Sequence, residues 1–407
     1  MKQLIELKRG CSRQPNINAV IKMRKIIKRI CVVLVVDDLG YGGAERQVVE
    51  LANNLDRDRF DVHVCTLSGH LPLRRQLKYQ QNNLHIVARK FRFDFTVVAR
   101  LARLLRTLNA DIVHGYLFSA EIASRLAGRL AGTPLVIGTE RSANYHPTRR
   151  KIFAYKLTRG CVDLVIANSK AGADFNRMTF GQNSLEYKVI RNGVNIEKFR
   201  PRYQIAMRNE LGLPKEKRVI GVFASFKPAK NHSMIFRSFK IVIDSFPDTQ
   251  LLLVGDQLDG NISGTGEYHT RMKNLINELG VRQRCTLLGS RDDVELIYPA
   301  CDITVLSSFY EGMPNVLLES MACGVPVVAT DVCDNRYIVK DGEVGHLIKV
   351  GDEVAMAHHI ESLIGDTALR QEMGQRARNW VIEEFSSKRL AENTETVYME
   401  LLGKKHK

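Results

Sequence analysis

Two glutamates that lie eight residues apart, Glu311 and Glu319, flank the predicted start of a helix. Gly312 and Pro314 stand between them, and proline suits a first helical turn because its missing N–H is not needed there. A helix start leaves backbone N–H groups unpaired, and such groups bind anions. The N–H groups concerned here belong to Met313, Asn315 and Val316.

This arrangement of groups suits one class of ligand. Phosphates would lie on the helix start, sugar hydroxyls would bond to Glu311, and ribose hydroxyls would bond to Glu319, because carboxylates accept hydrogen bonds from hydroxyls. The pattern therefore favours a nucleotide-sugar site. An amphipathic surface helix with two solvated acids would have the same spacing, and the spacing alone leaves both interpretations open.

The elements that must position these residues alternate between strand and helix. The segment Ile30–Val36 is continuously apolar, as strands buried on both faces of a parallel sheet are. It leads into a turn that contains Gly42 and Gly43 and then into a helix, so the backbone could approach a phosphate there. The GxGxxG fingerprint is absent, which argues against a nicotinamide enzyme.

The alternation continues through the first half of the chain. Strands are predicted at 61–67, 84–88, 111–116, 135–138 and 163–168, and helices at 95–108 and 120–131. His114 lies near the end of one of these strands, where ligand-facing residues collect in open α/β sheets. A structural role for a single histidine is the alternative. Ser169 is predicted to cap the helix that follows residue 168.

A second α/β set begins at 218–223 and is followed by a loop with Lys227 and Lys230, which are suitably placed for a diphosphate. Its further strands are predicted at 250–254, 285–288, 303–306 and 327–329, and the chain is predicted to be helical from residue 353 onward. We therefore predict an α/β protein with two Rossmann-like parallel-sheet domains that face each other across a cleft. The predicted divisions are a basic tail at 1–29, an acceptor-side domain at 30–202, a nucleotide-sugar domain at 203–380 and a returning helix at 381–407.

Charge is distributed unevenly over the chain, whose net charge is +16. Residues 1–200 hold 35 Lys and Arg against 16 Asp and Glu, whereas residues 201–407 hold 25 against 28. A basic half suggests contact with a negative surface. Arg100, Arg103 and Arg106 follow the apolar face of the helix at 95–108, which suits either a membrane surface or an ordinary surface helix. Nucleic acid is disfavoured, because aromatics are not interleaved with the basic residues.

Cysteine spacing and hydropathy indicate a cytoplasmic protein. The eight cysteines form no CxxC pair, and most lie in apolar runs, so reduced buried thiols are expected. The longest apolar run, Ile30–Val36, is too short to span a bilayer, and no secretory signal pattern is visible. Met23 is an alternative start of translation.

Several segments, in this order, resemble the retaining glycosyltransferases of family 4, which have the GT-B fold. The resemblance runs from about residue 31 to 400, and its last segment is the most specific. The segments are GGAERQVVELANNL at 42–55, VIRNGVN at 189–195, FKPAKNH at 226–232, VGD at 254–256, LGSRDDV at 288–294 and SSFYEGMPNVLLESMACGVPVVATD at 307–331.

The resemblance implies a role for each matching position. Glu311 would contact the donor sugar near the transferring carbon, Glu319 would hold the ribose, and Lys230 would stabilise the diphosphate leaving group. Such enzymes need no metal and no cofactor, because lysine and the helix start supply positive potential. Glu311 and Lys230 are the predicted catalytic residues. The predicted donor contacts are Gly42, Gly43, Lys227, Lys230, Arg291 near the base, Gly312, Met313, Asn315, Val316 and Glu319, and the acceptor-side candidates are His114 and Tyr116.

Three departures from the family pattern qualify this interpretation. Ser225 replaces a frequent arginine, so Lys227 is the candidate for the second charge. Tyr116 replaces a frequent second histidine, and Cys333-Asp334 with Tyr337 replaces a glycine pair and a following glutamate. A subfamily feature and weakened activity both remain open.

The resemblance and the charge together predict a retaining transferase that moves a sugar from a UDP- or GDP-linked donor to a lipid-linked saccharide. Its expected place is peripheral, on the cytoplasmic face of an anionic membrane, in assembly of exopolysaccharide, capsule or O-antigen. One alternative is a transferase for a small soluble acceptor such as a sugar phosphate. Another is a GT-B partner protein with little activity.

Overall fold

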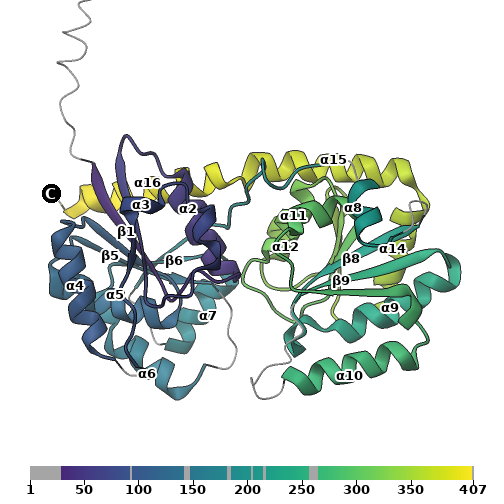
Figure 1. Ribbon diagram of the computed structural model, residues 1–407, viewed down its shortest axis with the longest axis horizontal. Coiled ribbons are helices and arrows are strands. Elements are labelled where there is room, and N and C mark those ends of the chain that lie inside the picture. Colours follow the sequence, from purple (N-terminus) through teal and green to yellow (C-terminus); the bar gives the residue numbers. More distant parts are fainter. Residues whose placement is uncertain are drawn as a thin grey trace, which may run out of the picture.

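The structure is a computed structural model that describes residues 29–91, 94–141, 147–180, 185–202, 205–213, 217–255 and 265–405. It contains two parallel sheets side by side, with helices packed on them (Figure 1). Apart from Arg29, the predicted basic tail lies outside the described residues. The prediction of two parallel-sheet domains is confirmed.

The first sheet has seven strands in the order β3-β2-β1-β4-β5-β6-β7. Central strand β1 is the apolar segment predicted from the sequence, and Val32 to Val36 are fully buried in it. The strands are β1 (Ile30–Val36), β2 (Phe60–Thr66), β3 (Leu84–Ile86), β4 (Ile112–Gly115), β5 (Leu135–Glu140), β6 (Leu164–Ala167) and β7 (Glu186–Val189). The helices are α2 (Gly43–Asn54), α3 (Gln80–Asn83), α4 (Thr96–Thr107), α5 (Phe118–Ala131), α6 (Arg149–Leu157) and α7 (Lys170–Phe180).

Helix α4 is an ordinary surface helix. Its apolar side chains, including Leu101 and Leu105, are buried in the domain core. Arg100 pairs with Asp94 at 2.5 Å, and the Arg106 side chain donates to the carbonyl oxygen of Leu130. Most of the predicted apolar face is therefore used inside the domain, and the N-cap Phe95, 83% exposed, is an apolar side chain that stays accessible. This pattern favours the surface-helix interpretation of α4.

The second sheet has six strands in the order β10-β9-β8-β11-β12-β13. It repeats the strand-helix alternation of the first, as the sequence predicts. The strands are β8 (Arg218–Phe223), β9 (Thr249–Val254), β10 (Cys285–Gly289), β11 (Ile303–Leu306), β12 (Val327–Thr330) and β13 (Gly345–Ile348). The helices are α8 (Ile205–Glu210), α9 (His232–Ser245), α10 (Thr265–Glu278), α11 (Val294–Ile297), α12 (Asn315–Ala322), α13 (Asn335–Ile338) and α14 (Glu353–Gly365).

Two long helices end the described chain. Helix α15 (Thr367–Glu384) lies on the second half, and α16 (Ser387–Lys405) returns to the first (Figure 1). Leu390 and Tyr398 of α16 belong to the hydrophobic core of the first sheet. The last helix therefore packs back across the molecule, as the predicted fold requires.

Short, partly polar strands escaped the sequence analysis. Strand β7 contains Glu186 and Lys188, which interrupt an apolar pattern, and β13 is only four residues long. Both are edge strands, so hydrogen bonding to a neighbour defines them more than hydropathy does. No helix within the described residues has the length and apolar character needed to span a membrane.

Close packing of α15 against α12 yields a stability test. A Cβ at Gly374 would lie 2.1 Å from the backbone oxygen of Gly324. Gly374→Ala should therefore lower the free energy of unfolding by about 1–3 kcal/mol, measured by urea denaturation. Gly403→Ala in α16, where a Cβ meets open space, is the control and should leave stability equal or slightly higher. Equal stability of the two variants would contradict this packing.

Candidate active site

The loop between β11 and α12 places the two glutamates of the sequence motif. Helix α12 begins at Asn315, and Pro314 is its N-cap with φ −75° and ψ 114°. The proline therefore stands just before the first turn and not within it. Its ring has no N–H, so nothing is lost where the helix starts. The start of α12 lies against the other half of the molecule, since the Asn315 side chain bonds to Gln47 and to the carbonyl oxygen of Gly43.

Glu311 and Lys230 form an ion pair at the tip of this loop. Lys230 Nζ lies 2.5 Å from Glu311 Oε1, and Ser308 Oγ donates to the same oxygen at 2.6 Å. Ser307 Oγ donates to the carbonyl oxygens of Lys230 and Asn231, which joins the two loops. The two residues predicted to be catalytic are thus held together by side chains from the ends of β8 and β11.

The lysine loop is rigid around its histidine. His232 stacks on Phe226 with ring centroids 4.4 Å apart, and its backbone N–H donates to Tyr268 Oη. Burial, followed by the nearby Lys230 charge, lowers the pKa of His232 to about 4. The ring is therefore neutral at pH 7, and the positive charges of this loop are those of Lys227 and Lys230.

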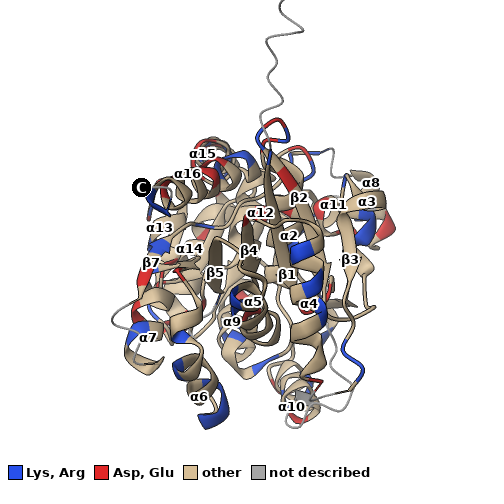
Figure 2. Cartoon of the chain, turned by 90° about the vertical axis from the view of Figure 1, so that its left-hand side faces the viewer, with Lys and Arg blue, Asp and Glu red and all other residues tan. Residues whose placement is uncertain are grey.

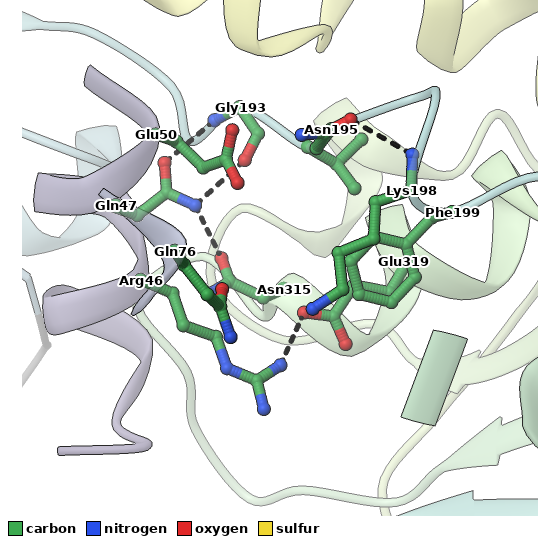
Figure 3. Close-up of a pocket in the computed structure, with 11 residues that line it drawn as sticks. Arg46, Gln47, Glu50, Gln76, Gly193, Asn195, Lys198, Phe199, Asn315 and Glu319 are labelled. Carbon is green, nitrogen blue, oxygen red and sulfur yellow. Dashed lines mark hydrogen bonds and ion pairs between the residues drawn. The ribbon is translucent and has the colours of Figure 1, made fainter. Parts of the chain in front are cut away.

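Glu319 is buried and bound from both sides. Its side chain is 6% exposed, and Arg46 Nη1 lies 2.9 Å from Oε1 (Figure 3). Tyr298 Oη donates to Oε2 at 2.9 Å. Burial raises the pKa of Tyr298 well above its ordinary value, so the phenol keeps its proton and donates. A carboxylate offers about four acceptor positions, so capacity for ligand hydroxyls remains. Arg46 comes from α2 of the first half.

The predicted glycine turn faces the start of α12. Asn315 Nδ2 donates to the carbonyl oxygen of Gly43 at 3.3 Å, and a Cβ at Gly43 would lie 3.4 Å from that nitrogen. At Gly42 a Cβ would collide with the Glu45 carboxylate. The Gly42 contact is with the flexible end of a side chain of the same half and the Gly43 contact is of ordinary length, so the turn lies against the start of α12 without requiring glycine at either position.

Amides complete the contact between the halves. Asn192 Nδ2 donates to Asn315 Oδ1 at 2.7 Å and to the carbonyl oxygen of Met313 at 3.0 Å. Gln47 bonds through both ends of its amide to the backbone of Gly193, and these residues line a small cavity beside Glu319 (Figure 3). The sequence analysis missed Arg46, Gln47 and Asn192. They lie within the quoted segments GGAERQV and VIRNGVN, so the resemblance marks their segments but no local pattern reveals their partners.

The remaining predicted donor residues, Lys227, Arg291 and Gly312, differ in their exposure and in their partners. Lys227 is exposed just before the short turn Pro228–Lys230, where a ligand could reach it. Arg291 pairs with Asp293 at 2.6 Å and with Glu210 at 3.4 Å, so its charge is already balanced. A Cβ at Gly312 would lie 2.5 Å from the backbone oxygen of Arg141, so this loop also touches the first half.

His114 and Tyr116 do not face open space. Both are 1% exposed. The two ring nitrogens of His114 bond to Tyr398 Oη at 2.7 Å and to Thr139 Oγ1 at 2.7 Å. Burial lowers the pKa of His114 well below its ordinary value, so it stays neutral. The structure gives His114 the structural role of joining β4 and β5 to α16, and it does not support direct acceptor contact by either residue.

Comparison with known proteins agrees with this architecture. Residues 41–198 match the model of Glycosyltransferase Family 4, and residues 204–380 match that of Glycosyl transferases group 1. UDP-Gal:alpha-D-GlcNAc-diphosphoundecaprenol alpha-1,3-galactosyltransferase of Escherichia coli is 26% identical over 381 residues, covering 89% of this chain and 95% of the relative. N-acetyl-alpha-D-glucosaminyl L-malate synthase of Bacillus anthracis is 24% identical over 375 residues, covering 89% and 94%.

Solved structures show the same fold. The crystal structure of Anabaena Alr3699/HepE in complex with UDP and glucose has a TM-score of 0.80 at 22% identity, covering 91% of this chain and 100% of that one. The two family matches follow one another along the chain and coincide with the two sheets. The chain therefore belongs to the glycosyltransferases of family 4 and is a transferase with the two-domain GT-B fold.

Proposed function

We propose that this glycosyltransferase moves a sugar, with retention and without a metal, from a UDP- or GDP-linked donor to a lipid-linked saccharide in cell-surface polysaccharide assembly. The observation that carries the donor assignment is the Glu311–Lys230 pair beside the start of α12. One acid, one cation and one helix start lie together where the two sheets face each other. They match the sugar and the diphosphate of a nucleotide sugar.

The proposed chemistry follows from this pair. An ammonium group has three N–H donors, so Lys230 can bond to Glu311 and still donate to phosphate oxygens as the leaving group gains charge. Glu311, fixed by Lys230 and Ser308, would accept a hydrogen bond from the donor sugar. The departing phosphate would help to deprotonate the acceptor on the same face of the sugar. No side chain is assigned as general base.

The proposal of a lipid-linked acceptor rests on the name of one relative and on the exposed surface of helix α6. The Escherichia coli relative carries a diphosphoundecaprenol-linked saccharide in its name, whereas the Bacillus anthracis relative carries malate, so a small soluble acceptor is the competing candidate. Helix α6 favours the lipid-linked acceptor. Phe153 and Leu157 on it are 68% and 70% exposed, and basic residues lie on the same helix (Figure 2). These are Arg149, Arg150 and Lys156, which are exposed, and Lys151, which is partly buried.

Removing the charge of Glu311 tests the donor site. Glu311→Gln keeps the shape of the side chain but weakens both its bond to Lys230 and its acceptor strength. We expect turnover to fall about 100- to 1000-fold, the usual effect of removing one preorganised electrostatic contact. The measurement is nucleotide release from UDP- and GDP-sugars in the presence of lipid-linked acceptor.

Glu343→Gln is the matched control, because Glu343 is exposed on the same half and outside the cleft. It should keep wild-type turnover. If wild type and Glu311→Gln release equal amounts of nucleotide from an active preparation, the assigned role is wrong. If the wild type releases none from any donor, the protein is a partner without turnover.

Nucleotide binding can be tested before the acceptor is known. Addition of UDP or GDP should raise the melting temperature, because a ligand at 100 times its Kd stabilises the native state by about 2.7 kcal/mol. The nucleotide with the larger shift identifies the donor class. Adenosine diphosphate provides the comparison, and equal shifts with all three would argue against a specific nucleotide site.

Vesicle binding tests the membrane assignment. The protein should sediment with vesicles that contain anionic phosphatidylglycerol at low salt, and salt should release it. Replacing both Phe153 and Leu157 by serine should weaken sedimentation several-fold, because each exposed apolar side chain contributes by burial in lipid. Val354→Ser, at a residue 69% exposed in the second half, is the control. Failure of the wild type to sediment, together with transfer to soluble acceptors only, would favour the small-acceptor alternative.

A further inference from the structure

Three neighbouring strands of the first sheet end in polar groups that have no partner. Strands β5, β6 and β7 lie side by side in the sheet. Within the described residues, the buried atoms without a hydrogen-bond partner include Arg141 Nε after β5, Asn168 Oδ1 after β6 and Arg191 Nε after β7. Ligands of open α/β sheets bind at the carboxyl ends of the strands. Unsatisfied buried polar atoms in a native protein need an explanation, and a missing ligand is one.

Arg141 is the central member of this row. Its Nη1 donates to the neutral Asn192 amide oxygen at 2.8 Å, and its guanidinium lies over the Tyr116 ring at 4.9 Å. Among the described residues, no carboxylate forms an ion pair with it within 4.0 Å. The adjacent Glu140 bonds to Asn176 instead. Burial away from water is the largest influence on the Arg141 guanidinium, and it lowers the pKa of this group.

Three other enclosed arginines differ from Arg141, whereas Arg57, bonded to the carbonyl oxygens of Ala52 and Val62, likewise has no ion pair within 4.0 Å among the described residues. Arg125 pairs with Glu121 at 2.5 Å, Arg208 with Asp302 at 2.9 Å, and Arg46 with Glu319 at 2.9 Å. A buried charge without a counter-charge is costly, so each of these is neutralised within the fold. Among the described residues, Arg141 has no such direct ion pair, and the Glu140 carboxylate acts on it only from a distance. A residue whose counter-charge is brought by a ligand would show this condition.

The row faces the proposed donor site. A Cβ at Gly312 would lie 2.5 Å from the Arg141 carbonyl oxygen and 3.1 Å from Asn168 Oδ1, so both residues border the loop that carries Glu311. Arg191 lies over the Tyr337 ring of the second half at 4.9 Å. The row therefore lies where the first half packs against the loop that carries Glu311 and against Tyr337 of the second half.

The start of α7, which lies in the same region, already has an anionic partner. The Asp334 carboxylate accepts hydrogen bonds from the backbone N–H groups of Lys170 at 2.7 Å and Ala171 at 3.0 Å. This acid from the second half supplies the anion for that helix start. The positive side chains of this region are then Arg141, Arg191 and the exposed Lys170.

We propose that Arg141, with Arg191 and Asn168, forms a second anion site beside the donor sugar, which binds a phosphate or carboxylate group of a saccharide substrate. The arginines donate to the anion, and the Asn168 oxygen accepts from a neighbouring hydroxyl. The site rests on the proposed function, because it places this anion next to a donor at Glu311. A phosphate would come from the acceptor, and a carboxylate would come from an acidic sugar.

The test measures anion binding while the donor site is full. Protein saturated with UDP or GDP, whichever stabilises it more, is titrated by calorimetry with inorganic pyrophosphate and, separately, with glucuronate. Wild type should bind at least one probe saturably. Arg141→Met should bind it about 10- to 100-fold more weakly, since charge-assisted hydrogen bonds are lost, and Arg141→Lys should lie between. A preference for pyrophosphate assigns the anion to the acceptor phosphate, and a preference for glucuronate assigns it to a sugar carboxylate.

The controls separate binding from folding. Arg103→Met removes an equal charge at an exposed position of α4 and should bind the probes as wild type does. The melting temperature of Arg141→Met should be equal or higher, because an uncompensated charge is removed, whereas a structural arginine would lower it.

Two results would overturn the site. One is saturable binding that is unchanged in Arg141→Met, and the other is no binding of either probe by nucleotide-bound wild type. Failure of the wild type to bind any nucleotide is a different result, because it refutes the proposed function itself. Unchanged nucleotide affinity in Arg141→Met shows that the two sites are distinct.

Discussion

The ion pair between Arg46 and Glu319 is the contact on which the geometry of the cleft depends. It joins α2 to α12 across 273 residues of sequence, and Tyr298 completes the bonding of the acid. A buried carboxylate is stable only when its partners are in place. The acid predicted to hold a ribose is therefore satisfied from both halves of the molecule, so the distance between the halves and the state of this site are coupled.

The charge of the cleft differs between its two walls. On the wall formed by the second sheet, Glu311 balances Lys230 and Glu319 meets Arg46. On the wall formed by the first sheet, the direct partners of Arg141 among the described residues are neutral, Asn192 and the Tyr116 ring, and the Glu140 carboxylate acts on it without a direct ion pair. The positive charge of the first wall is thus less fully paired than that of the second, which is consistent with the basic character of the first half of the chain.

Two residues of one departure from the family pattern form contacts between the halves. Asp334 caps α7, and Tyr337 lies under Arg191. The preceding Cys333 has φ +49°, a left-handed conformation that glycine adopts at lower cost, which agrees with glycine being usual at that position. Asp334 and Tyr337 bind the two halves together, so they have a structural role here whatever their effect on turnover.

The sequence by itself determined the fold class, most strands and helices, and the segments that carry the site. An apolar run such as Ile30–Val36 is stable only as a buried strand of a parallel sheet. The turn before Asn315 starts a helix through the conformation of its own residues. Both effects are local, so the sequence reveals them. Only the tertiary structure decided which charges are balanced. Arg46 and Arg141 look alike in the sequence, and His114 looks like a ligand-facing residue, but their partners come from strands and helices far along the chain. Local patterns cannot encode such pairings, since burial and counter-charge depend on how the two sheets and α16 pack together.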